Sequence, residues 1–375
     1  MRDLKKSRMK RSWDRWPTYS PQCRRDVLAL LRDGTRLTAL QANPKVGPGP
    51  REGSWCWQLE RLATRMTGRD TIACANATLG LTAALRALGL PAGSSVATTA
   101  FTFSATSAAI VHAGLRPEFF DIHPERMTMD SAKLHGALPG IKAVLPVDLF
   151  GRVHNGGWPV PCVQDACQAV GSDGAGRTAI GDFVVWSFNG RKNVPAGEGG
   201  MVLAPDPEAA RHVRLWLSHG ENFGARHPGT NGHLNELSAC VAFHGLRRVQ
   251  SRNAVRRLRA ALLTRLLQGC PLRVFPDSND HAFYVYPAIL EASVDRPRLV
   301  AALARLGVHS QPGYIEPPIH EYLAFSEYQR RLPVTEELSR KTLLLLPTQI
   351  TSCTTAADVR WLAARIRMAF AIIGT

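Results

Sequence analysis

Short apolar segments alternate with helix-like segments from about residue 70 to residue 245, and this alternation limits the possible folds more than any other feature. The apolar segments have the length of strands and are apolar almost throughout. Such strands are buried on both faces, which is typical of a mostly parallel sheet covered by helices. The pattern predicts an α/β fold with a mostly parallel central sheet flanked by helices, such as those expected at 78–88 and 104–112. The predicted strands are 94–99, 116–122, 141–147, 160–165, 182–188 and 199–204.

The chain beyond residue 235 has a different pattern. A long helical segment at 235–268 begins with Asn235, a residue type that often caps a helix. We predict a large α/β domain at 1–245 and, at 246–375, a connecting helix and a small α+β domain. The other elements expected are a proline- and glycine-containing loop at 43–53, a strand at 282–290, a helix at 295–306, a proline-broken loop at 312–318 and two C-terminal helices, the last capped by Thr354 or Thr355.

Composition and motif content exclude several classes of protein. With 375 residues, 45% apolar and 20% charged, the chain is typical of a globular protein rather than a disordered one. No apolar run reaches about 18 residues, so we expect no membrane span. The basic N-terminus has no apolar stretch behind it and does not resemble a secretory signal. The eight cysteines form no CxxC pair, which disfavours a metal knuckle or disulfide framework and indicates the cytoplasm.

Basic residues are in excess, with a formal net charge of +16 (46 − 30). This excess suits an anionic partner such as nucleic acid, an anionic surface or a phosphorylated small molecule. Seven arginines lie between Arg247 and Arg265. On a helix most of them would be solvated, with Val249, Val255 and Leu258 turned inward. Because no zinc knuckle, RNA-binding aromatic strand or helix-turn-helix is found, we expect no nucleic-acid partner; a solvated face and attraction of an anionic substrate stay open.

The segment 187–201 carries the strongest chemical signal. A strand ends at Ser187, a glycine-containing turn leads to Lys192, and the loop closes on GEGG before the next strand. A lysine in a turn at a strand end can point into a cleft, where burial lowers its pKa because the ammonium form loses solvation. A neutral amine can then form a Schiff base. The alternative is a solvated loop lysine.

Three further positions could bind a cofactor. Asp165 ends a strand at the ligand edge of the sheet and could keep a pyridinium nitrogen protonated, or it could only cap the next helix. The segment 76–78 opens a helix, where free amides and a threonine hydroxyl can hold a phosphate, or where Asn76 is a plain cap. Phe103 follows a strand and could stack on a planar ring or fill the core.

The order and spacing of these signals resemble enzymes of the pyridoxal 5′-phosphate (PLP) fold type I superfamily, and more narrowly the DegT/StrS-type family of sugar and aminocyclitol aminotransferases. The resemblance covers about residues 12–370, and the segment 15–19 (RWPTY) is similar to the start of the aminocyclitol and aminohydroxybenzoate branch. The fold implied is that of fold type I, with a smaller C-terminal domain. The matching segments are 77–81 (ATLGL), 102–106 (TFSAT), 164–171 (QDACQAVG), 187–200 (SFNGRKNVPAGEGG) and 229–239 (GTNGHLNELSA).

The resemblance implies a role for each matched residue. Lys192 would be the catalytic residue, forming a Schiff base with PLP and moving a proton, while Asp165 would pair with the pyridinium nitrogen. Asn231 would reach the phosphate in a neighbouring subunit, which implies a homodimer with composite active sites. The other cofactor contacts implied are Ala77, Thr78 and Ser187 at the phosphate, Phe103 stacked on the ring and Gln168 near the ring hydroxyl.

The chain also departs from the family pattern. Asp148 stands where the family often has His, and His233 stands where Arg or Lys is common. Together with His320, which matches a family histidine near the substrate, these residues bear on the acceptor more than on the cofactor. Gly80 and Cys167 each replace a usual Ala. The family's dehydratase branch replaces the lysine by histidine, so the presence of Lys192 disfavours that branch.

The function implied is PLP-dependent transfer of an amino group from glutamate or glutamine to a keto-sugar or keto-cyclitol, in amino-sugar or natural-product biosynthesis. Two alternatives stay open. One is a PLP enzyme of another class, such as elimination or replacement on an amino acid, because a fold does not determine a reaction. The other is a basic binding protein with an inactive cofactor site. The sequence leaves the acceptor, the stereochemistry and the pathway open.

Overall fold

A computed structural model was used to describe the protein. It describes residues 19–33, 37, 40–43, 47–130, 134, 136, 138–154, 157–172, 181–220, 228–274, 281–346 and 355–374. The predicted motif at 15–19, apart from Tyr19, and Thr354 lie outside the described residues.

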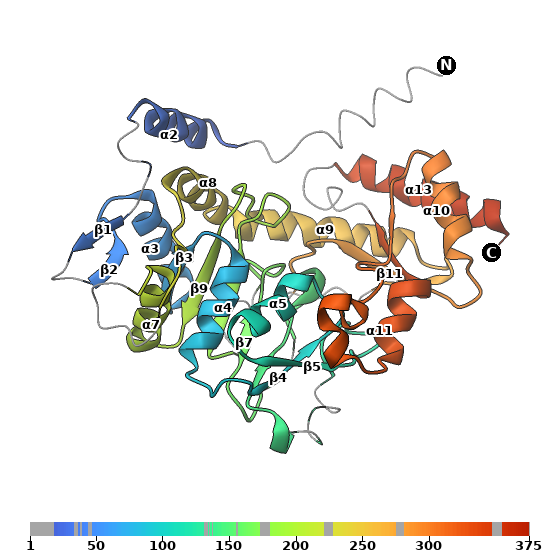
Figure 1. Ribbon diagram of the computed structural model, residues 1–375. Coiled ribbons are helices and arrows are strands. Elements are labelled where there is room, and N and C mark those ends of the chain that lie inside the picture. The colour runs from blue at the N-terminus through green and yellow to red at the C-terminus, as the bar shows by residue number, and fades with distance from the viewer. Residues whose placement is uncertain are drawn as a thin grey trace.

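A seven-stranded sheet forms the centre of the larger part of the molecule (Figure 1). β5, β4 and β6 are parallel, as are β7 and β8, and the parallel bridges Val144–Cys162 and Val147–Asp165 join β6 to β7. β9 runs antiparallel between β8 and β3. The fold is therefore α/β with a mostly parallel sheet, as predicted. The strands are β3 (Asp70–Cys74), β4 (Ser95–Thr99), β5 (Arg116–Phe120), β6 (Ala143–Leu145), β7 (Val163–Asp165), β8 (Phe183–Ser187) and β9 (Gly200–Ala204).

Helices cover both faces of this sheet because its strands are apolar on both sides. Every residue of β6, β7, β8 and β9 is buried. On β8, Val185 packs in the cluster that includes α4, α5 and α7, whereas Val184 and Trp186 pack against α3 and α8. The helices are α3 (Trp55–Thr67), α4 (Ala77–Ala87), α5 (Ser104–His112), α7 (Pro207–Leu217) and α8 (Glu236–Leu246).

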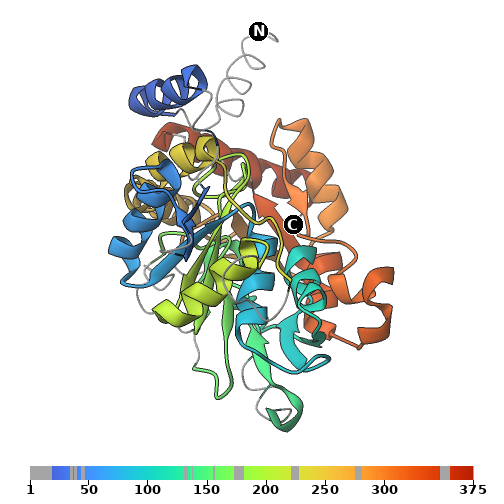
Figure 2. The same ribbon diagram turned by 60° about the vertical axis from the view of Figure 1, so that its left-hand side comes forward.

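The C-terminal part of the chain forms a second, antiparallel sheet of order β10-β11-β13-β12. One face of it packs with α9, α10 and α13 around a core of their Leu, Val and Ala residues. These elements lie together on one side of the molecule (Figures 1 and 2). They are α9 (Val249–Leu266), β10 (Leu272–Val274), β11 (Tyr286–Leu290), α10 (Arg296–Arg305), β12 (Gln311–Pro312), α11 (Pro333–Glu337), β13 (Leu343–Leu346) and α13 (Ala356–Ile373).

Shorter elements complete the described chain. α2 (Pro21–Arg32) starts at Ser20, whose side chain accepts a hydrogen bond from the backbone N–H of Cys23. The antiparallel strands β1 (Leu40–Asn43) and β2 (Gly47–Pro50) overlap the loop predicted at 43–53, so that prediction was wrong for β2. The 3₁₀ and π segments are η2 (Leu138–Gly140), η3 (Leu149–Gly151), η4 (Ile319–Glu321), η5 (Leu323–Tyr328) and η6 (Leu338–Thr342).

The predicted helix 235–268 is broken into α8 and α9 at Arg247 and Arg248. Asn235 caps α8 as predicted, because its Oδ1 accepts a hydrogen bond 2.8 Å long from the N–H of Ser238. The inward face predicted for the arginine-rich stretch is confirmed at Val249, which is buried, but was wrong at Val255 and Leu258, which are 39% and 70% exposed. The helical repeat instead continues from the buried Val249 through four further buried positions, which are Asn253, Arg256, Ala260 and Leu263.

The last helix was predicted with its cap. Thr355 accepts a hydrogen bond from the N–H of Asp358, and the carboxylate of Asp358 accepts from the N–H of Thr355, which is a complete capping box. The strand β13 was missed, because only two helices were predicted beyond the loop at 312–318. Among the described helices, none combines the length and apolarity needed to cross a membrane.

Candidate active site

A cavity of about 1300 Å³ lies where the carboxyl ends of β7 and β8 approach the C-terminal sheet. Its wall includes residues of α4, α5 and α9 and the segment 311–315. Ligands of open parallel sheets bind at such an edge, because loops there leave a crevice beyond the strand ends. The residues predicted from the sequence that line it are Ala77, Thr78, Phe103, Asp165, Gln168, Ser187 and Lys192.

Asp165 is held rigidly at the end of β7. Its side chain is buried, and Oδ2 accepts a hydrogen bond 2.8 Å long from the hydroxyl of Thr106 on α5. Oδ1 accepts a second bond, 3.1 Å long, from the N–H of Cys167. Thr102 is hydrogen-bonded to Thr106 in turn, at 2.9 Å. The carboxylate is therefore oriented by its neighbours and faces the cavity, and no basic side chain among the described residues is bound to it.

Lys192 lies in the loop between β8 and β9. Its backbone N–H donates to the carbonyl of Asn189 at 2.8 Å, and the turn is closed by a bond from Gly190 to Gly197. The ammonium group lies 5.0 Å from the centre of the Tyr284 ring, a cation–π arrangement. The side chain is half buried and lines the cavity. The loop thus fixes the backbone and leaves the amine accessible to a ligand.

The N-terminus of α4 forms a polar pocket at another part of the wall. Asn76 caps the helix, and its Oδ1 accepts a hydrogen bond 2.9 Å long from the N–H of Leu79. The N–H groups of Ala77 and Thr78 have no partner within the helix, because the first turn lacks preceding carbonyls. The Ser187 hydroxyl, at the end of β8, also lines the cavity. N–H groups and hydroxyls at a helix start suit a phosphate.

Gly200 explains why the motif closes on two glycines. A Cβ at position 200 would lie 2.8 Å from the backbone nitrogen of Ala77, which is too close for a stable structure. Gly199 has φ = +152°, a backbone conformation that favours glycine. β9 therefore packs directly against the helix start, and this close contact positions the N–H groups of α4 at the cavity.

Gln168 connects the sheet edge to the C-terminal part of the chain. Its Oε1 accepts from the N–H of Phe150 at 2.8 Å, and its Nε2 donates to the hydroxyl of Tyr314 at 2.9 Å. Burial raises the pKa of the Tyr314 phenol. Phe103, 57% exposed in the single chain, lies at the start of α5. Both the oxygen and the nitrogen of the Gln168 amide are therefore held in place, whereas the Phe103 ring is largely free to contact a ligand.

Sequence reasoning missed several residues of the wall. Thr106 lies inside the matching segment 102–106, but its contact with Asp165 depends on how α5 crosses β7. Tyr284 and Tyr314 come from the C-terminal part of the chain, and no local pattern distinguishes them from core tyrosines. The arginines Arg252 and Arg256 of α9 also line the cavity. Their concentration was visible in the sequence, but the rotation of α9 that directs them to the cavity was not.

Asn231 lies outside the cavity wall and is exposed. Its segment is fastened to α7: a Cβ at Gly229 would lie 2.2 Å from the carbonyl oxygen of Trp216, and one at Gly232 would lie 2.3 Å from Leu217 Cδ2. The carbonyl of Gly232 also accepts a bond from Ala75 at 2.7 Å. The two glycines therefore allow the segment to pack tightly, with Asn231 at the surface of this chain.

The three residues predicted near the substrate also lie outside the wall of this cavity. Asp148 is fully buried and accepts hydrogen bonds of 2.7 Å from Gln164 Nε2 and from His154 Nδ1. His320 is buried, with its Nε2 3.5 Å from a carboxylate oxygen of Glu336. Both side chains are buried in this chain, and their role near the acceptor stays a prediction.

His233 faces a different, smaller hollow. Its Nε2 lies 3.1 Å from the Ser218 hydroxyl, and its ring lies 5.9 Å from that of His219. Burial, together with the nearby His219, lowers the pKa of His233 to about 4. The imidazole is therefore neutral at pH 7. The role of His233 near the acceptor likewise stays a prediction.

The two small-residue departures are explained by packing and by contact with the cavity. A Cβ at Gly80 would lie 3.1 Å from Cys74 Sγ and 3.2 Å from both Val185 and Val202, so α4 packs closely on the sheet here. Cys167 is buried beside Asp165, and burial raises the pKa of its thiol well above the usual range. Cys167 is therefore a neutral neighbour of the carboxylate.

A sequence model of the DegT/DnrJ/EryC1/StrS aminotransferase family matches residues 50–366. The chain belongs to this family. A curated relative, UDP-N-acetyl-3-dehydro-alpha-D-glucosamine 3-aminotransferase of Acidithiobacillus ferrooxidans, is 30% identical over 294 residues, which are 73% of this chain and 78% of the relative. L-glutamine:2-deoxy-scyllo-inosose aminotransferase of Streptoalloteichus tenebrarius is 28% identical over 321 residues, which are 72% of this chain and 75% of the relative.

Two solved structures share the fold. A DegT DnrJ EryC1 StrS aminotransferase from Brucella abortus superposes with a TM-score of 0.81 at 24% identity and covers 100% of this chain and 98% of its own. NtdA from Bacillus subtilis, solved with bound PMP, gives a TM-score of 0.78 at 22% identity and covers 93% of this chain and 83% of its own. The DegT/DnrJ/EryC1/StrS protein described here is a PLP-dependent aminotransferase.

The cavity residues of this aminotransferase fit PLP. Asp165 offers a carboxylate for the pyridinium nitrogen, and Lys192 offers an amine for the carbonyl. The start of α4 and the Ser187 hydroxyl offer donors for the phosphate. These groups line one cavity, and their chemistry matches the ring nitrogen, the carbonyl and the phosphate of the cofactor.

Proposed function

We propose that this aminotransferase moves an amino group from glutamate or glutamine to the ketone carbon of a keto-sugar or keto-cyclitol. The observation that carries the proposal is that Lys192, Asp165 and the N-terminus of α4 line one cavity. A binding protein that uses the fold alone would not need an accessible lysine and a rigid carboxylate on the same wall. The relatives named above act on ring ketones of both kinds, judging by their names.

The residues of the chain divide the chemistry among them. When bound, PLP supplies a carbonyl that exchanges amines and a ring that withdraws electrons. Lys192 would hold the cofactor covalently. Once the donor amine has displaced it, the free Lys192 amine would take a proton from Cα of the donor and return a proton to C4′ of the cofactor. Asp165 would keep the ring nitrogen protonated, because a nearby negative charge favours the charged form of a base. Thr106 and the N–H of Cys167 would hold the Asp165 carboxylate in position.

The cavity has room for an acceptor beside the cofactor. Its volume of about 1300 Å³ exceeds the roughly 300–1,000 Å³ of a pocket for one small ligand. The charged residues of its lining are mostly basic, which favours the binding of anionic groups such as the cofactor phosphate, the donor carboxylate and a nucleotide diphosphate. The basic residues are Arg191, Lys192, Arg252 and Arg256, and the acidic residues are Asp165 and Glu198.

We further propose a homodimer in which Asn231 completes the site of the neighbouring subunit. Two features support this: Asn231 is exposed on a tightly packed segment, and it lies outside the cavity of its own chain. Phe103, 57% exposed at the cavity wall, would also be covered by a neighbour. The segment carrying His233 would then bring that residue near the interface.

The test is an amine balance with a labelled donor. The protein is incubated with PLP, ¹⁵N-labelled glutamine or glutamate, and a panel of nucleotide-linked keto-sugars and free keto-cyclitols. Mass spectrometry should find the ¹⁵N in an aminated ring, in proportion to the keto acid formed from the donor. Formation of a keto acid and free ammonia without an aminated ring would contradict transfer and favour elimination. The class of acceptor that is aminated distinguishes nucleotide-linked from neutral rings.

A further inference from the structure

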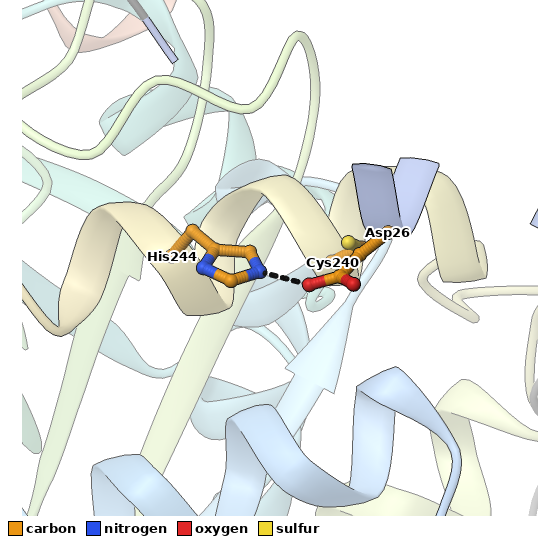
Figure 3. Close-up of side chains that lie close together, drawn as sticks. All are labelled: Asp26, Cys240 and His244. Carbon is orange, nitrogen blue, oxygen red and sulfur yellow. Dashed lines mark hydrogen bonds and ion pairs between the residues drawn. The ribbon is translucent and has the colours of Figure 1, made fainter. Parts of the chain in front are cut away.

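A cluster of side chains that could bind a metal lies outside the cavity lining, between α2 and α8. Ligand atoms of Asp26, Cys240 and His244 all lie within 4.8 Å of one another. His244 Nε2 and Asp26 Oδ2 are 2.8 Å apart, although these residues are 218 positions apart in the chain. Figure 3 shows the Cys240 sulfur beside the Asp26 carboxylate and the His244 ring turned toward it. Three different ligand types thus meet at one point.

The positions on the two helices explain how the cluster forms. Cys240 and His244 are four residues apart on α8, so both side chains lie on the same helical face. Cys23 and Asp26 are three residues apart on α2 and likewise share a face.

The cluster is shielded from solvent. Cys240 is 0% exposed and Cys23 is 1% exposed. The side chains of His244 and Asp26 are only 10% and 20% exposed. Within the described residues, the thiols of Cys23 and Cys240 form no hydrogen bond. A sulfur, a ring nitrogen and a carboxylate oxygen with little access to water are the surroundings of a structural metal site rather than of a surface ion pair.

We propose that Asp26, Cys240 and His244 bind a zinc ion that fastens α2 to α8. Thiolate, imidazole and carboxylate are the ligands of zinc, whereas calcium and magnesium select oxygen alone. With metal–ligand bonds of about 2.0–2.3 Å, the ligand atoms of a tetrahedral site lie roughly 3.3–3.8 Å apart. The ion would therefore replace the His244–Asp26 hydrogen bond after these two atoms separate by about half an ångström.

A competing account treats the cluster as a hydrogen-bonded His–Asp pair with two buried thiols as apolar filling. A second cluster of possible ligands, formed by His320, Glu321 and Glu336, is a weaker candidate for a metal site. There Glu336 Oε1 already accepts a bond from Leu332 N–H, and Glu321 is paired with Arg340. The α2–α8 cluster therefore has the stronger claim, and the two accounts of it differ in metal content.

The first experiment measures metal in the full-length, untagged holoenzyme. After the protein is stripped with a chelator and incubated with zinc chloride, elemental mass spectrometry should find one zinc per chain after gel filtration. Cobalt(II) in place of zinc should give the d–d bands of a tetrahedral site and a thiolate-to-cobalt charge-transfer band, read as a difference spectrum against the cobalt-free holoenzyme. Absence of retained zinc together with absence of these bands would overturn the proposal.

Variants then locate the site. Asp26→Asn keeps the shape of a partly exposed side chain and should weaken zinc binding at least about tenfold. Cys240→Ser should abolish or shift the thiolate-to-cobalt band. Cys270→Ser, at a thiol near Arg367 on another helix, is the control and should bind zinc as the wild type does. Zinc content and cobalt spectra unchanged in Asp26→Asn and Cys240→Ser would place any bound metal elsewhere and contradict the site.

Discussion

Asp165 and Lys192 are restrained to different degrees, and the difference suits the roles proposed for them. Both oxygens of Asp165 accept hydrogen bonds, from Thr106 and from the N–H of Cys167. The Lys192 amine contacts the face of Tyr284 at 5.0 Å, a contact that it can leave at little cost. A carboxylate that keeps a ring nitrogen protonated must stay in place, whereas an amine that moves a proton must be able to swing.

We expect Asp165→Asn to slow proton transfer far more than it weakens cofactor binding. The amide keeps the shape and the Thr106 contact but removes the negative charge that favours a protonated ring nitrogen. Loss of one such interaction in a dry site should slow the half-reaction by about 10²-fold or more. The measurement is single-turnover amine transfer from glutamate or glutamine, with and without α-deuterium. Thr106→Val, which keeps the charge, should lose less; a near wild-type rate for Asp165→Asn would make Asp165 a helix cap.

His281 should make the fold less stable in acid. Burial, together with the nearby Arg152 and Arg257, lowers the pKa of His281 to about 3. The unfolded chain binds this proton near pH 6.5, so folding stability is lost as the pH falls below that value. The loss from this group is up to about 1.4 kcal/mol per pH unit until the folded form also binds the proton. Urea unfolding between pH 7 and pH 4 measures it.

The control for that prediction is His281→Gln, whose carbonyl can still accept the hydrogen bond that Phe283 N–H donates to His281 Nδ1. This variant should show a shallower fall in unfolding free energy with decreasing pH, even if its stability at pH 7 is lower. An unchanged slope would mean that His281 does not remain neutral in the folded protein at these pH values.

At the scale of single residues, sequence motifs predicted the cavity-lining residues that lie within a local motif, such as Ser187 and Lys192. They could not predict Thr106 or Tyr314, because the contacts of these residues cross between distant elements. Nor could they predict that the carboxylate of Asp148 is bound by His154 and Gln164 inside the fold. A local pattern predicts that a residue lies at the end of a strand or helix, but it does not predict which side chains of neighbouring elements that residue contacts.

At the scale of elements, the close packing of β9 against α4 is what we expect to set cofactor affinity. Gly200→Ala would place a Cβ 2.8 Å from the Ala77 nitrogen and push the helix start away from the cavity. We expect PLP affinity to fall at least about tenfold, since several N–H contacts to phosphate are lost together. Gly190→Ala is the matched control, because its Cβ would meet nothing closer than 3.6 Å. Fluorescence titration of the apoenzyme with PLP measures both, and equal affinities would contradict this packing role.

Elements with strong caps were predictable, and elements decided by tertiary packing were not. Asn235 and Thr355 mark helix starts because their side chains bond to the first turn, which is a local interaction. The break at Arg247 and Arg248 and the exposure of Leu258 depend on how α9 packs against the second sheet. The strand β13 is a run of leucines, a residue type equally suited to a buried helix, so only its pairing with β11 decides its conformation.

At the scale of the whole molecule, the proposed site needs two chains. Mixing Lys192→Ala chains with Asn231→Ala chains should restore activity, because each mixed dimer has one site with both groups intact. Random exchange should recover about a quarter of wild-type activity. Subunit exchange must be shown separately by native mass spectrometry. No recovery despite exchange would mean that Asn231 acts within its own chain or has no role in the site.

The division of the chain also belongs to this scale. We propose that residues 1–245 and 246–375 act as a cofactor-binding domain and a smaller domain that covers it. The break between α8 and α9 lies next to this boundary, and Tyr284 and Tyr314 bring the second part to the cavity wall. The cluster of Asp26, Cys240 and His244 is likewise visible only in the whole molecule, since its members are too far apart in sequence to form a motif.

The central claim is that Lys192 holds the cofactor in this cavity, and one measurement addresses it directly. Borohydride reduction of the PLP-loaded protein, followed by proteolysis and peptide mass mapping, should place the reduced cofactor on Lys192. Lys192→Ala, treated in the same way, should carry no such label at the peptide 187–200. A reduced cofactor found on another lysine, or an active enzyme whose Lys192 stays unmodified, would contradict the account.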